Sequence, residues 1–98
     1  MAIRSFSDSG AEDICHRRNS KQARNCLPVE LHHKAEVKLA RIAGATNISD
    51  LKSLRGNHFE ALKGDRRGQF SIRINSQYRI CFRWENNDAY DVEIVDYH

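Results

Sequence analysis

The stretch FEALKGDRRGQFSIRINSQYRICFRW, residues 59–84, decides the fold of this 98-residue chain. Its second half alternates apolar and polar residues twice, over residues 70–74 and again over residues 78–84. A strict period of two is typical of strands that bury only one face. Residues 75–77, Asn-Ser-Gln, separate the two runs and favour a turn. The stretch therefore predicts a β-hairpin with one apolar face and one wet face.

The turn also predicts how the two strands pair. If Ile74 pairs with Tyr78, Arg73 lies directly opposite Arg79 on the wet face. Like charges that face each other across a ladder destabilise a sheet. An anion over the pair would relieve that repulsion, so the register indicates an anion-binding surface. The alternative is that both arginines extend into water or reach an acidic side chain.

The chain ends in a third alternating run, residues 90–94, which predicts a last strand. We expect Trp84 to pair with Tyr90 across the turn that precedes it. Arg83 then faces Asp91 in an ordinary cross-strand ion pair. The same register leaves Arg79 opposite a valine, so Arg79 is the stronger functional candidate.

The first half of the chain predicts helices. Pro28 favours a helix start and Gly44 favours its end. The apolar residues that share one face of this helix are Leu31, Ala35, Leu39 and Ile42. Shorter helices are expected after a cap at residues 7–9, after Ser20, and over residues 48–54, with a short first strand at residues 3–6. Helices followed by an antiparallel sheet make residues 1–98 a single α+β domain.

Positive charge is concentrated in one part of the chain. The formal net charge is +3, but residues 52–83 hold eight lysines and arginines and only two acids, a net charge of +6. The remaining residues therefore carry −3. A basic segment of this kind favours a polyanion as partner, most often a nucleic acid. The alternative is a solvated basic loop.

Several classes of protein are excluded by what the sequence lacks. No run of 18 apolar residues is present, so we expect no membrane-spanning segment and no membrane partner. The three cysteines lack CxxC spacing, which argues against a disulfide framework or a zinc site and for a reducing cytosol. No apolar leader is visible either, so a cytoplasmic location is expected. We expect neither a metal nor another cofactor.

A set of charged and aromatic residues could converge on the wet face of the sheet. Its members are Glu60, Lys63, Arg73, Arg79, Tyr97 and His98. RNA cleavage without a metal needs a base for the 2′-hydroxyl, cations for the phosphorane and an acid for the leaving 5′-oxygen. Histidine titrates near pH 6.5, which suits His98 as the acid, and Glu60 could be the base. The alternative is that a terminal histidine is only a frayed chain end.

The chain resembles the HigB-type toxins of the RelE/ParE superfamily. The matching segments are IRSF (3–6), LPVELHHKAEVKLARI (27–42), EALKGDRRGQFSIRINSQYRICFRW (60–84) and DAYDVEIVDYH (88–98). The resemblance implies a RelE-like microbial ribonuclease fold, with N-terminal helices packed on a twisted antiparallel β-sheet. It also implies metal-independent cleavage of messenger RNA, typically in the ribosomal A site. The implied partner is a helix-turn-helix, HigA-like antitoxin, and operator DNA is bound only through the antitoxin complex.

The resemblance also assigns residues. Relatives place an acidic residue or a histidine just before a leucine-lysine pair, which Glu60 and Lys63 match. Several HigB proteins have histidine at this position, so the identity of the base stays open. Relatives carry an arginine early in the second hairpin strand, matched by Arg79, and end in a Tyr-His or His-Tyr pair, matched by residues 97 and 98. Arg73 is a looser match.

These arguments lead to the hypothesis of an RNA-cleaving toxin. Glu60 is the expected base and His98 the expected acid. The remaining expected contacts are a phosphate clamp of Arg79 and Arg73, backbone orientation by Lys63 and Tyr97, and further RNA contacts by Arg66 and Arg67. One rival is a module that docks on ribosomal RNA or on an antitoxin without cutting. Another is a gyrase-directed ParE-like toxin, against which the Tyr-His ending argues.

Overall fold

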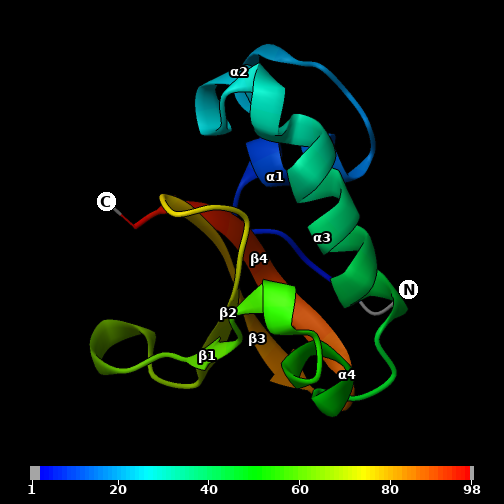
Figure 1. Ribbon diagram of the computed structural model, residues 1–98. Coiled ribbons are helices and arrows are strands. Elements are labelled where there is room, and N and C mark those ends of the chain that lie inside the picture. Colours follow the sequence, from blue (N-terminus) through cyan, green and yellow to red (C-terminus); the bar gives the residue numbers. More distant parts are fainter. Residues whose placement is uncertain (1–2, 98) are drawn as a thin grey trace.

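The hairpin expected from the central stretch forms the middle of a four-stranded sheet in the computed structural model, which describes residues 3–97 (Figure 1). The sheet order is β1-β2-β3-β4. The strands, all antiparallel to their neighbours, are β1 (Glu60–Ala61), β2 (Gln69–Arg73), β3 (Tyr78–Glu85) and β4 (Asp88–Asp96). The predicted register of the hairpin is confirmed, since Arg73 pairs directly with Arg79.

The pairing of β3 with β4 departs from the prediction halfway along. Arg79 faces Val95 as expected, but Arg83 pairs with Tyr90 and not with Asp91. A β-bulge shifts the register between Cys81 and Arg83. Asp91 has a left-handed backbone (φ 54°), as the extra residue of such a bulge often does. The predicted register was therefore wrong beyond the bulge, which also turns Tyr90 to the same face as Arg83.

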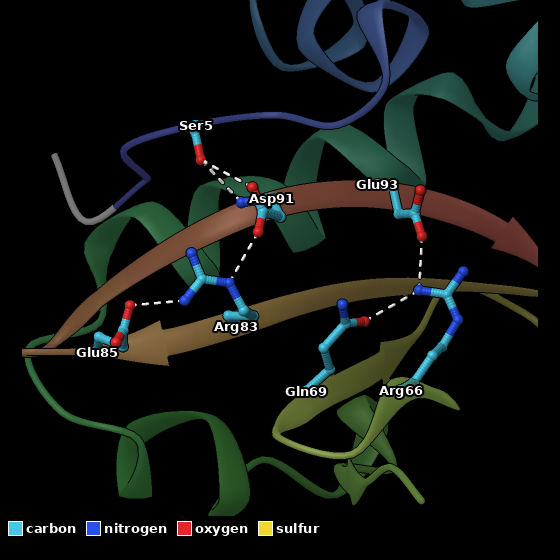
Figure 2. A network of polar contacts seen from close by, with 7 residues as sticks. All are labelled: Ser5, Arg66, Gln69, Arg83, Glu85, Asp91 and Glu93. Carbon is cyan, nitrogen blue, oxygen red and sulfur yellow. Dashed lines mark hydrogen bonds and ion pairs between the residues drawn. The ribbon is translucent and has the colours of Figure 1, made fainter. Parts of the chain in front are cut away.

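Residues 3–6 hold the bulge in place. They do not form a full strand; two isolated parallel bridges join Ile3 to Ala89 and Phe6 to Val92. Between these bridges, the Asp91 amide donates to the Ser5 hydroxyl (2.9 Å). Figure 2 shows Ser5 beside Asp91 on the edge of β4. Residues 3–6 thus stabilise the bulge at Asp91, which lies 86 positions after Ser5 in the sequence.

The first two helices begin where the sequence supplies caps. In α1 (Ser9–Cys15) the Asp8 carboxylate accepts from the Gly10 amide (2.9 Å), and in α2 (Lys21–Cys26) the Ser20 hydroxyl accepts from Ala23 (3.0 Å). The long helix is α3 (His32–Gly44), preceded by the 3₁₀ turn η1 (Val29–Leu31). The remaining helical turns are α4 (Ser49–Lys52), η2 (Arg55–Asn57) and η3 (Gly64–Arg66).

The helices cover one face of the sheet, and the core lies between the two layers (Figure 1). Ala35, Leu39 and Ile42 of α3 are fully buried in one cluster with Ile80 and Phe82 of β3. The α+β class is confirmed, and so are three of the four predicted positions of the apolar face; the fourth, Leu31, lies in η1 before the helix and is only partly buried. None of the helices among residues 3–97 is both long and apolar enough to cross a membrane.

Candidate functional site

The face of the sheet opposite the helices carries the candidate site. On this face Arg79 lies beside Cys81 along β3, and Cys81 pairs with Ser71 of β2. Although they face away from the helical core, Ser71 and Cys81 are completely buried. Burial raises the pKa of the Cys81 thiol, so this cysteine is a poor nucleophile. The site is formed by the longer polar side chains above them.

Two adjoining hollows lie on this face. The larger, of about 530 Å³, is lined by Glu60, Lys63, Arg66 and Tyr97, together with the chain between the first two. The smaller, of about 230 Å³, is lined by Arg73, Asn75, Ser76, Arg79 and Tyr97. Because Tyr97 lines both, the structure brings the predicted base, cations and tyrosine to one surface.

Arg79 is the most firmly held cation of this surface. Its Nε donates to the Ser71 hydroxyl (2.7 Å), and its Nη2 donates to the His58 carbonyl and more weakly to the Ser71 carbonyl (3.4 Å). The guanidinium carbon lies 5.8 Å from the centre of the Tyr97 ring. These acceptors are neutral, so they orient the guanidinium without cancelling its charge. An oriented charge of this kind suits the binding of a phosphate.

Two neighbouring arginines are engaged differently. Arg66 forms an ion pair with Glu93 (2.6 Å) and donates to Gln69 (3.0 Å), as Figure 2 shows. The hydrogen bond to Glu93 raises the pKa of Arg66, and the carboxylate compensates part of its charge. Its expected RNA contact therefore competes with an internal partner.

Arg83 confirms the structural role expected for it. Despite the shifted register it reaches Asp91 (2.7 Å), and it also reaches Glu85 (2.6 Å). These two carboxylates raise the pKa of Arg83. It lines neither of the two hollows of the candidate site. This arginine is therefore a suitable control for the others.

The other predicted residues fall in different places. Glu60 is exposed at the start of β1, opposite Ser71, and borders the larger hollow with Lys63. Arg67 is exposed and lines neither hollow. His98, the predicted acid, lies outside the described residues.

Tyr97 links the end of the chain to the hairpin. Its amide donates to the Gln77 carbonyl (2.6 Å), which fastens the residue before His98 to the β2–β3 turn. The side chain is 43% exposed, and partial burial raises its pKa. Tyr97 is thus held at the site as a neutral hydroxyl at physiological pH.

Some residues that contribute to the site were not predicted from the sequence. Ser71 was expected only as a polar position of the alternating strand, yet its hydroxyl orients Arg79. Asn75 and Ser76 were assigned to the turn alone, although they line the smaller hollow. The contribution of His58 is a backbone carbonyl, for which a sequence carries no signal. Among residues 3–97, no group of three His, Cys, Asp or Glu side chains is placed to hold a metal ion.

Comparison with known proteins gives matches along nearly the whole chain. A family model for the RelE-like toxin HigB of type II toxin-antitoxin systems matches residues 5–98. The chain is 31% identical over 96 residues to the Endoribonuclease HigB of Proteus vulgaris, a match that covers 98% of this chain and 99% of that protein. The pattern of matches therefore includes the segments that form the site.

Two further relatives match over a shorter part. Toxin HigB-1 of Vibrio cholerae is 40% identical over 63 residues, which is 64% of this chain and 66% of that protein. An uncharacterized protein of Haemophilus influenzae is 39% identical over 63 residues, which is 64% of this chain and 62% of that protein. These two matches span slightly less than two thirds of each relative.

Solved structures with a similar fold include two YoeB-YefM complexes from Staphylococcus aureus. One gives a TM-score of 0.62 and the other, a heterotetrameric toxin-antitoxin complex, 0.61. Both are 22% identical and cover 98% of this chain and 94% of the matched chain. At this identity the similarity concerns the fold, and it agrees with the α+β arrangement described above.

Proposed function

Because this chain belongs to the HigB-like family, the RelE-like toxins of type II toxin-antitoxin systems, we propose that it is an endoribonuclease that cleaves messenger RNA without a metal. The observation that supports this most directly is the convergence of Glu60, Arg79 and Tyr97 on two adjoining hollows. The name of the Proteus vulgaris relative, an endoribonuclease, agrees with it.

In the proposed reaction the 2′-hydroxyl of the substrate attacks the neighbouring phosphorus. Glu60 takes the proton of that hydroxyl, and His98 gives a proton to the 5′-oxygen as its bond to phosphorus breaks. The products are a 2′,3′-cyclic phosphate and a free 5′-hydroxyl. Arg79 and Arg73 hold the phosphate, on which negative charge builds up in the transition state. Bound phosphate would also relieve the repulsion between these two paired arginines.

The remaining contacts in the proposal follow the basic surface. Lys63 and Tyr97 orient the RNA backbone beside the larger hollow. Arg67 contributes a further contact to messenger or ribosomal RNA, as does Arg66 when it exchanges Glu93 for a phosphate. We propose that the protein acts in the cytoplasm on ribosome-bound messenger RNA. A helix-turn-helix antitoxin would inhibit it, and operator DNA would be bound only through that complex.

The test is to express the protein and map the 5′ ends of messenger RNA. The wild type is expected to create new ends, and Glu60→Gln, Arg79→Ala and His98→Ala are each expected to lose them. Arg83→Ala, which removes an arginine from the same strand and the same face, is the matched control and keeps cleavage. If all three site variants still cut, the assigned site is wrong. If the wild type slows growth but creates no ends, the protein is a binding module.

A further inference from the structure

Lys38 is a buried cation on the helix that covers the sheet. It is only 6% exposed, although it is a lysine. Its Nζ donates to two neutral oxygens, the Gly56 carbonyl (2.9 Å) and Asn57 Oδ1 (3.1 Å). Burial, and next the charges of Arg41 and Lys34, lower the pKa of Lys38. Burying an ammonium group is costly, so this arrangement calls for a reason beyond packing.

Asn57 joins Lys38 to two other elements. It is fully buried, and its Nδ2 donates to the Leu51 carbonyl (3.1 Å) at the end of α4. Its Oδ1 accepts from Lys38 and also from Arg41 of α3 (3.4 Å). The Asn57 side chain therefore connects α3, α4 and η2, and its hydrogen bonds to Lys38 and Leu51 are buried.

The residue that follows carries this connection to the site. His58 has a left-handed backbone (φ 44°), which is costly for a residue other than glycine and needs support from its surroundings. Its carbonyl accepts from Arg79. Two residues later the chain reaches Glu60 in β1. The direction of the His58 carbonyl depends on the loop that Lys38 and Asn57 hold.

We propose that Lys38 and Asn57 are positioning residues for the Arg79 guanidinium. They act from the helical layer, through the backbone of residues 56–58, on a group at the opposite face of the sheet. Lys38 does not touch the substrate; it fixes the carbonyl that, with Ser71, sets the orientation of the Arg79 fork. This inference rests on the proposed function for its catalytic consequence, but the positioning itself is measurable without RNA.

The first experiment measures the Arg79 Nε–H by ¹⁵N NMR in the full-length protein, with the signal assigned from its absence in Arg79→Lys. In the wild type this proton is expected to exchange slowly with water, because the buried Ser71 hydroxyl accepts it. Lys38→Met is expected to shift the signal and to speed its exchange at least about tenfold, since the loop opens more often. Lys21→Met makes the same change at an exposed position of α2, away from Lys38, and leaves the signal as it is. Should Lys38→Met not fold, the nearly isosteric Asn57→Leu removes both the acceptor of Lys38 and the donor to Leu51 and is expected to give the same shift.

The second experiment measures binding of a 2′-O-methylated RNA, which lacks the attacking hydroxyl and is not cut. Lys38→Met is expected to weaken binding about tenfold when Arg79 is present, and hardly at all in an Arg79→Ala background, because the pair acts as one unit. Equal losses in both backgrounds, or a folded Lys38→Met protein with an unchanged Arg79 signal, would overturn the proposal. If the wild type neither binds nor cuts RNA, the proposed function fails, and the NMR result alone decides the positioning.

Discussion

Removing the Arg79 side chain separates the catalytic role of this residue from its structural one. Arg79→Ala leaves the buried Ser71 hydroxyl and the His58 carbonyl without their donor, a loss of about 1–3 kcal/mol. The same change removes the repulsion from Arg73 across the ladder, which stabilises the fold by about 0.2–1 kcal/mol. The free energy of unfolding is therefore expected to fall by about 0–3 kcal/mol. Cleavage is expected to fall far more, by about 100- to 1,000-fold, as for loss of one donor to a charged transition state.

The two quantities need two assays on the same preparations. Urea unfolding followed by tryptophan fluorescence gives the free energy, since Trp84 packs against the core beside Phe82. Single-turnover cleavage of a ribosome-bound messenger gives the rate. In Arg83→Ala, which loses two partly exposed ion pairs, we expect the free energy of unfolding and the cleavage rate to stay near those of the wild type. The reasoning is refuted if Arg79→Ala cuts within about threefold of wild type, or if its lost activity merely follows a loss of folded protein.

Three further predictions concern the fold. In Gly10→Ala the new Cβ would lie 2.5 Å from Cys26 Cβ and 2.6 Å from the Gln22 carbonyl oxygen, so α1 and α2 must separate. Urea unfolding should show that the free energy of unfolding falls by about 1–3 kcal/mol. Asn87 (φ 63°) lies in the tight turn between β3 and β4, where Asn87→Val should cost about 1–2 kcal/mol by thermal unfolding and leave cleavage unchanged. Burial and a hydrogen bond to Asp8 raise the pKa of the Cys26 thiol from 9.0 to about 12. The folded protein therefore keeps this proton between those two pH values while the unfolded chain releases it, so stability falls as the pH rises through that window. Urea unfolding at several pH values should show that the free energy of unfolding falls less in Cys26→Ala than in the wild type. Equal falls in both proteins would contradict the raised pKa of Cys26.

Local patterns account for the parts of the fold that were predicted correctly. The alternation on either side of residues 75–77 defines the hairpin and places Arg73 opposite Arg79, because a strand period of two leaves little choice of register once the turn is known. The apolar spacing along α3 and the caps at Asp8 and Ser20 act within a few residues of each other. The polar residues of the site were proposed mainly from a resemblance to a family, and the roles of Glu60 and His98 remain predictions.

Only the tertiary structure decided the contacts between segments that are distant in the sequence. The bulge at Asp91 depends on a hydroxyl from Ser5, so no reading of the last strand alone could place it. Glu93 compensates part of the charge of Arg66 although it lies on β4, two strands from β2 in the sheet, and the alternating pattern says nothing about which loop residue reaches it. Lys38 appears polar within the α3 pattern, yet it is buried, and η2 supplies its neutral acceptors. The sequence alone thus determines elements whose stabilising contacts are near in the chain. The orientation of Arg79, which hydrogen-bonds to groups 8 and 21 positions away, is decided only when the helical layer and the sheet have packed together.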